Sequence, residues 1–216
     1  MNVQDQSPTF TEDGFEMTFG VNYLGHFLLT MLLVDDLKKS APDSRIVIVA
    51  SEQHNPESRG PKRHQSAHID FENMQLLAPG TFNAHLAYKN SKLANVLFGY
   101  ELARRLHGSG VTCNSLCPGF LPQTGLIRHN QCIRCLLVCC FRGFCRCLPI
   151  TRTTGKGADG IVYVASNESV QGVGGKYFRD CVSVDSSGES MDREVAAKLW
   201  NLSAELVQLD APEPTK

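Results

Sequence analysis

The clearest pattern along the chain is an apolar stripe with the spacing of an α-helix, between residues 11 and 39. Thr11, Glu12 and Asp13 supply capping and first-turn signals at its start, and Pro42 follows its end. Because a helix places residues three and four positions apart on one face, these signals predict one long helix over residues 11–39. The stripe consists of Phe15, Phe19, Leu24, Phe27, Leu28 and Leu32.

A continuous run of mostly β-branched residues follows at 45–50, where the sequence reads Arg-Ile-Val-Ile-Val-Ala. A run that is apolar on both faces predicts a strand covered on both sides, as in a parallel sheet. Residues 52–79 are rich in proline, glycine, histidine and charged side chains, and they predict a long polar loop. Loops of this length usually carry function or are disordered.

The same alternation of helix and strand continues after the loop. Residues 81–107 predict a second long helix, which Gly108 and Gly110 end. Residues 111–116 predict another strand, which Pro118-Gly119 stops.

Three further elements close the chain. Residues 157–166 predict a helix, residues 175–178 a short strand, and residues 191–209 an amphipathic helix. This order of elements predicts an α/β fold, with a partial Rossmann-like, doubly wound parallel sheet and right-handed crossovers. We find no internal repeat and no linker, so residues 1–216 are expected to form a single domain.

Charge and cysteine placement exclude several classes of protein. The formal net charge of −1 gives no electrostatic reason to expect a nucleic acid partner, because phosphate-binding surfaces need a basic excess. No signal sequence is visible, and no uninterrupted apolar run approaches the roughly 18 residues that span a bilayer. Six of the nine cysteines fall between residues 132 and 147, whereas a disulfide framework would spread them out.

Tyr88 and Lys92 are the first residues with a chemical interpretation. Their spacing of four places them on one face of the predicted helix, one turn apart. A tyrosine has an ordinary pKa of about 10, so work as an acid or base near neutrality requires a lower pKa, and an ammonium group nearby favours one. The spacing alone is common by chance, and the pair needs support from elsewhere in the chain.

That support comes from Ser51 and Asn22. Ser51 ends the predicted buried strand, and ligands of open α/β sheets bind outside the carboxyl ends of the strands. A hydroxyl there can hold a carbonyl oxygen of a substrate. Asn22 interrupts an otherwise apolar helix, where an unpaired amide is costly, so Asn22 is expected to have a partner.

These residues lie within segments that resemble the retinol dehydrogenase branch of the short-chain dehydrogenase/reductases. The resemblance covers nearly the whole chain. It is carried by Asp13-Gly14-Phe15-Glu16-Met17, Val21-Asn22-Tyr23-Leu24-Gly25-His26-Phe27-Leu28-Leu29, Ala87-Tyr88-Lys89-Asn90-Ser91-Lys92-Leu93-Ala94-Asn95, Cys117-Pro118-Gly119, Gly174-Gly175-Lys176-Tyr177-Phe178 and Ala197-Lys198-Leu199-Trp200.

The resemblance implies hydride transfer between a nicotinamide cofactor, NADP or alternatively NAD, and a hydrophobic small molecule such as a retinoid or steroid. Tyr88 would donate or accept the proton at the carbinol oxygen, and Lys92 would hold the ribose hydroxyls and lower the pKa of Tyr88. Ser51 would bind the substrate oxygen, and Asn22 would fix a water in the proton relay. The loop against the nicotinamide carboxamide would contain Pro118, Gly119 and Thr124, although its spacing is one residue longer than in typical retinol dehydrogenases.

The chain departs from the family at its start. Complete members carry a strand, a Thr-Gly-x-x-x-Gly-x-Gly turn and further strand–helix units before the Asp-Gly-Phe-Glu segment, so this chain is expected to be the C-terminal half of the fold. A non-catalytic fragment that cannot bind cofactor alone is therefore the alternative. Residues 155–160 fit the pattern Gly-x-Gly-x-x-Gly, but no strand is predicted before them, and we interpret them as an ordinary helix start.

The cysteine cluster at residues 132–147 has three interpretations. It could hold zinc, it could pack as apolar cover over the substrate pocket, or it could make a peripheral membrane contact with or without acylated cysteines. We expect no metal site. The four histidines His54, His64, His68 and His85 have irregular spacing and are interpreted as solvated loop residues. The expected location is the cytoplasm or the surface of an internal membrane, and the sequence does not indicate an oligomeric state.

Overall fold

The computed structural model describes residues 7–56, 65–121 and 153–209. Its centre is a four-stranded sheet in the order β1 (Arg45–Val49), β2 (Thr112–Cys117), β3 (Tyr177–Arg179) and β4 (Val182–Val184). The first three strands are parallel, and β4 runs antiparallel to β3. The predicted α/β fold with a parallel sheet is confirmed.

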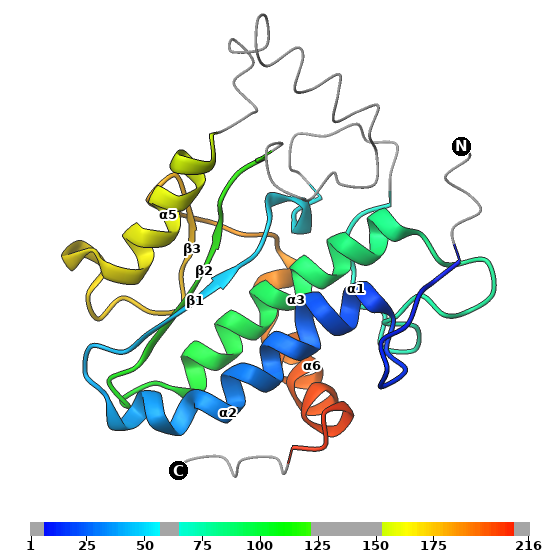
Figure 1. The fold of residues 1–216 in the computed structure, drawn as a ribbon, viewed down its shortest axis with the longest axis horizontal. Coiled ribbons are helices and arrows are strands. Elements are labelled where there is room, and N and C mark those ends of the chain that lie inside the picture. The colour runs from blue at the N-terminus through cyan, green and yellow to red at the C-terminus, as the bar shows by residue number, and fades with distance from the viewer. Residues whose placement is uncertain (1–6, 57–64, 122–152, 210–216) are drawn as a thin grey trace, which may run out of the picture.

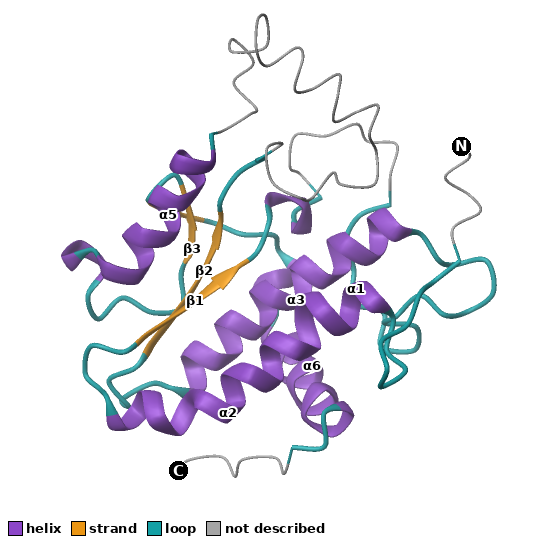
Figure 2. Ribbon diagram, viewed as in Figure 1, coloured by secondary structure: helices purple, strands orange, loops and turns teal. Residues whose placement is uncertain are grey.

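Helices cover both faces of this sheet (Figures 1 and 2). Successive residues of a strand point to opposite faces, and the core follows that rule. Cys117 and Tyr177 pack with the long helix α3 (Ala84–Arg105), while Leu116 and Phe178 pack with α5 (Thr154–Ser166). The run at residues 45–50 is apolar on both faces because β1 lies between α3 and α5.

The first helix starts later than its sequence predicts. It comprises α1 (Met17–Phe19), a π-helical turn (Gly20–Leu24) and α2 (Gly25–Lys39). Its N-cap is Glu16, whose carboxylate accepts the backbone N–H groups of Thr18 at 2.9 Å and Phe19 at 2.8 Å. The predicted start at residue 11 is wrong because the Asp-Gly pair at residues 13–14 forms a turn, with φ +84° at Gly14.

The inner side of this helix belongs to the core. Tyr23 and Phe27 are fully buried, and they join Phe98 of α3 and Trp200 of α6 (Arg193–Leu206) in an aromatic cluster. Ring centroids lie 5.1 Å apart for Phe27 and Phe98 and 5.2 Å apart for Phe27 and Trp200. By length and composition alone, Met17–Lys39 could also cross a membrane, and its outer side exposes Val21, Leu29 and Leu32.

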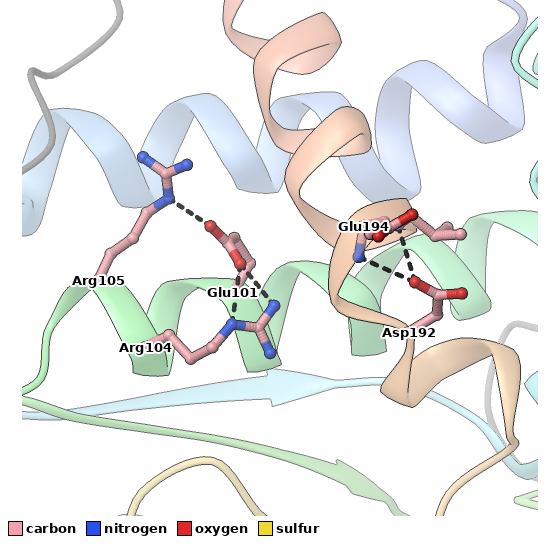
Figure 3. Close-up of polar contacts among 6 residues, drawn as sticks. Glu101, Arg104, Arg105, Asp192 and Glu194 are labelled. Atoms are coloured by element: carbon pink, nitrogen blue, oxygen red, sulfur yellow. Dashed lines mark hydrogen bonds and ion pairs between the residues drawn. The ribbon is translucent and has the colours of Figure 1, made fainter.

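Charged residues reinforce the contact between α3 and α6. Figure 3 shows Glu101 between Arg104 and Arg105, and Arg105 Nε donates to the Glu101 carboxylate at 2.7 Å. The Arg105 guanidinium also lies 4.3 Å from the ring centre of Trp200. At the start of α6, the Asp192 carboxylate accepts two backbone N–H groups as the N-cap, so the predicted start at residue 191 is two residues early.

Two further elements differ from their prediction. The helix predicted over residues 157–166 begins at Thr154, so the Gly-x-Gly-x-x-Gly stretch lies inside α5 as an ordinary helix start. Strand β4 was not predicted because its turn, Asp180-Cys181, lacks the glycine or asparagine typical of tight hairpins, although both residues have positive φ. The described part of the loop after β1 contains a 3-10 turn, Glu52–His54.

Candidate active site

Ser51, Tyr88 and Lys92 meet at the carboxyl end of β1. Ser51 follows the last strand residue by two positions, and Tyr88 and Lys92 project from successive turns of α3. The side chain of Ser51 lies within hydrogen-bonding reach of the Tyr88 hydroxyl group. Lys92 Nζ donates to the carbonyl oxygen of Val49 at 3.1 Å and lies 5.8 Å from the ring centre of Tyr88. The structure thus brings these three sequence candidates together.

The electrostatics of the pair follow from its partial burial. Burial raises the pKa of Tyr88, the hydrogen bond from Ser51 lowers it, and Cys117 raises it. Burial also lowers the pKa of Lys92. The net shift of the Tyr88 pKa is therefore upward, opposite to the direction expected from the neighbouring ammonium group, and Tyr88 keeps its proton at neutral pH.

Asn22 reaches this site through an intermediate residue. It lies in the π-helical turn, and its Nδ2 donates to Ser91 Oγ at 3.2 Å. Ser91 Oγ in turn donates to the carbonyl oxygen of Tyr88 at 2.7 Å. Asn22 therefore has the partner that its place on an apolar helix requires. π-Helical turns occur often at functional sites, and this one ties α2 to the turn of α3 that carries Tyr88.

Cys117 is a site residue whose individual role the sequence does not predict. It ends β2 and is buried, and its Sγ accepts the backbone N–H groups of Glu52 at 3.2 Å and Gly119 at 3.3 Å. One sulfur atom therefore joins the loop after β1 to the Pro118-Gly119 turn. Only the tertiary pairing of β1 with β2 places these two loops side by side, so no local signal could have revealed the contact.

His54 is the clearest correction among the site candidates. The expectation that it is solvated is wrong, because its side chain is buried, with 1% of the residue exposed. The reason is that residues 52–54 form a 3-10 turn directly after β1, which places the imidazole against the ring of Tyr177 of β3. His68, by contrast, is exposed as expected, and it pairs with Glu189 at 3.0 Å.

Some candidates fall outside the described residues. Thr124, His64 and the cysteines at positions 132–147 belong to this group, so the membrane-contact hypothesis and the longer carboxamide loop stay predictions. Pro118 and Gly119 are described and half-buried directly after β2. Gly119 has φ +84°, a conformation that favours glycine.

Comparisons with known proteins agree with this geometry. A scan against models of protein families finds no match. The chain is 44% identical to human (Homo sapiens) retinol dehydrogenase 14 over 199 residues, which are 92% of this chain and 54% of that protein. It is also 44% identical to human retinol dehydrogenase 13 over 202 residues, which are 94% of this chain and 57% of that protein.

One solved structure extends the comparison to the fold. The crystal structure of an uncharacterized protein from Mycobacterium paratuberculosis matches with a TM-score of 0.66 and 29% identity, over 96% of this chain and 64% of that one. This chain spans about half the length of the curated relatives that it matches. By its sequence relatives and its fold, the chain is similar to the short-chain dehydrogenase/reductases of the retinol dehydrogenase-like branch, and it matches those relatives over more than nine-tenths of its own length.

Proposed function

We propose that this chain carries the catalytic part of an oxidoreductase that transfers a hydride between a nicotinamide cofactor and a hydrophobic alcohol or carbonyl compound. The observation that carries the proposal is the meeting of Ser51, Tyr88 and Lys92 at the carboxyl end of β1, where Lys92 Nζ donates to Val49 O at 3.1 Å and lies 5.8 Å from the ring centre of Tyr88. Retinoids and steroids are the first substrates to test, since the curated relatives are named retinol dehydrogenases.

In the reducing direction, Tyr88 Oη donates its proton to the carbonyl oxygen of the substrate. Its raised pKa suits this direction, because the phenol stays protonated at neutral pH. Ser51 Oγ, which lies within hydrogen-bonding reach of the Tyr88 hydroxyl, donates a hydrogen bond to the same carbonyl oxygen of the substrate. After the transfer, Ser51 and the Lys92 ammonium stabilise the phenolate, and Asn22 fixes a water that returns the proton.

The residues present fit the nicotinamide side of a cofactor. Within the described residues Lys92 Nζ makes one hydrogen bond, to Val49, and an ammonium group has three N–H donors, so donors are left for ribose hydroxyls. Pro118, Gly119 and Thr124 are the proposed contacts of the carboxamide. When bound, NADPH supplies the hydride, with NADH as the alternative cofactor.

A non-catalytic fragment of such an enzyme is the second candidate. One observation favours it. Residues 155–160, which fit a dinucleotide fingerprint, are helical and do not form a strand-to-helix turn. Under this proposal the chain folds and keeps the geometry of Tyr88 but does not bind cofactor by itself.

Titration of the purified chain with NADPH, followed by calorimetry, separates the two proposals. Binding in the micromolar range, with turnover of retinal or a ketosteroid, supports the oxidoreductase. The absence of binding at millimolar NADPH refutes autonomous catalysis and supports the fragment. The same titration with NADH decides between the two cofactors.

Matched variants then test the roles of the two central residues. Tyr88→Phe should abolish turnover and leave NADPH affinity nearly unchanged, whereas Tyr163→Phe, which removes a hydroxyl bonded to Ser169 on the far side of the sheet, should change neither. Lys92→Met should weaken NADPH binding, while Lys89→Met, whose Nζ donates to Gln65 O, should not. Full activity of Tyr88→Phe would refute the mechanism.

The proposed place of action is the cytoplasm or the surface of an internal membrane. A peripheral contact with a membrane or with another hydrophobic surface is supported by the apolar side chains exposed on the outer side of the first helix, at Val21, Leu29 and Leu32. Sedimentation with phospholipid vesicles, compared between the wild type and Leu32→Glu, tests the contribution of this face.

A further inference from the structure

The buried imidazole of His54 makes two hydrogen bonds that fix where its proton lies. Its Nδ1 lies 2.6 Å from the carbonyl oxygen of Ser51, and its Nε2 lies 3.3 Å from the backbone nitrogen of Ser187. A backbone N–H can only donate, so Nε2 is the acceptor of that bond. Nδ1 therefore carries the proton and donates it to Ser51 O.

Ser187 is itself held firmly. Ser190 Oγ donates to the carbonyl oxygen of Ser187 at 2.6 Å and shares a second hydrogen bond of 2.6 Å with Ser186 Oγ. Ser186 Oγ also shares a hydrogen bond of 2.8 Å with the hydroxyl of Tyr100 on α3. All three serines are buried. The N–H group that His54 accepts is thus part of a polar network anchored to the helix that carries Tyr88.

Through Nδ1, His54 is hydrogen-bonded to Ser51, the residue that lies next to Tyr88. The carbonyl oxygen of Ser51 accepts the His54 ring N–H and, at 3.2 Å, the His54 backbone N–H. Ser51 Oγ meanwhile accepts the Gln53 N–H at 3.3 Å and lies within hydrogen-bonding reach of Tyr88. The turn after β1 therefore closes around Ser51, and its shortest contact with Ser51 is the bond from the imidazole.

We propose that His54 is a positioning residue, which holds Ser51 in hydrogen-bonding reach of Tyr88 by linking the Ser51 carbonyl to the Ser187 backbone. This inference rests on the proposed function for the importance of the approach of Ser51 to Tyr88, but the two side chains lie within reach of each other without cofactor or substrate. Its test can therefore be made on the chain alone, and a failure of cofactor binding does not affect the result.

Protonation of His54 is expected to release this link. A proton on Nε2 would face the Ser187 N–H, and the acceptor would be lost. Burial lowers the pKa of His54, which keeps the ring neutral at physiological pH. The charged and titratable groups near the ring are Glu52 on its own turn, Arg179, which pairs with Glu52, and Tyr177, whose ring centre lies 4.9 Å away.

The experiment uses the 13Cζ resonance of Tyr88 in tyrosine-labelled protein, assigned with Tyr88→Phe. Ser51→Ala supplies the position of this resonance without the Ser51 bond. His54→Phe keeps a ring but removes both hydrogen bonds, and it should move the resonance toward the Ser51→Ala position. His54→Asn, whose Nδ2 can replace the ring Nδ1–H, should move the Tyr88 resonance back toward its wild-type position. The control is His68→Phe at an exposed histidine, which should leave the Tyr88 resonance unchanged.

A wild-type Tyr88 resonance in His54→Phe would overturn the proposal. If His54→Phe does not fold, His54→Gln takes its place, because Gln can accept from Ser187 through Oε1 but does not reproduce the Nδ1–H donor. A difference between the Gln and Asn variants then supports the proposal, and identical Tyr88 resonances in the two refute it. Acidification of the wild type should shift the resonance in the same direction as His54→Phe, at a pH below the ordinary imidazole pKa of about 6.5.

Discussion

Glu16 offers the sharpest test of how this fold is held together, because it is a buried helix cap. Its two carboxylate oxygens accept the N–H groups of Thr18 and Phe19 at 2.9 and 2.8 Å, and its own N–H donates to Gln75 Oε1 at 2.7 Å. Only 2% of Glu16 is exposed, so water cannot replace the carboxylate without a rearrangement.

The expected loss in the free energy of unfolding follows from the two N–H groups that Glu16→Ala leaves without an acceptor. Each buried, unpaired donor costs about 1–3 kcal/mol, and part of this cost is offset because a carboxylate is no longer desolvated. We therefore expect Glu16→Ala to lower the free energy of unfolding by about 2–3 kcal/mol. The equivalent cap Asp192 is exposed, so Asp192→Ala should cost about 1 kcal/mol.

The assay is urea denaturation followed by the fluorescence of Trp200, the single tryptophan, which is 2% exposed in the core. Asp13→Ala is the matched control, because Asp13 belongs to the segment where the sequence alone predicts the helix start. It should change the free energy of unfolding by less than about 0.5 kcal/mol. Equal costs for Glu16→Ala and Asp13→Ala would refute the assignment of the cap.

Three further predictions use the same assay. Gly99→Ala should destabilise by about 1–3 kcal/mol, since a Cβ there would lie 2.3 Å from a serine hydroxyl of β2, whereas Gly160→Ala, with nothing within 4 Å, should stabilise by about 0.5–1 kcal/mol. Leu93→Ala should cost about 2–5 kcal/mol and Leu32→Ala, at 64% exposure, less than about 0.5 kcal/mol; similar losses would contradict the assigned core. The pKa of His54 is lower in the folded than in the unfolded state, so the free energy of unfolding should fall as the pH drops below about 7 and should level off below the folded-state pKa. His54→Phe should flatten this part of the dependence of the free energy of unfolding on pH. An unchanged dependence in His54→Phe would contradict the assignment to His54.

The sequence predicts the alternation of elements well because periodicity and β-branched runs are local. It places Ser51, Tyr88 and Lys92 at one site because strand ends and helix spacing follow general rules. Helix starts are less accurate, since Glu16 is an unusual cap whose place depends on a turn and on Gln75 from a distant loop. Most of the polar contacts around the site likewise join residues that are far apart in the chain.

His54 shows why the burial of a single residue is difficult to predict from the sequence. A histidine among prolines, glycines and charges suggests a solvated loop, and its partner Ser187 is more than a hundred residues away in the chain. Similarly, the direction of the Tyr88 pKa shift depends on how much of the phenol is buried, which spacing does not reveal. Burial and long-range hydrogen bonds are properties of the folded chain as a whole.

Helix α3 carries both the aromatic core residue Phe98 and the proposed catalytic pair Tyr88 and Lys92. A substitution that loosens the core therefore also moves Tyr88, and a variant of this helix that loses the proposed activity does not by itself identify a chemical role. For protein engineering, the helix is therefore a poor place for sequence diversity. Libraries that leave α3, the Ser51–His54 turn and the Pro118-Gly119 turn unchanged keep this support intact.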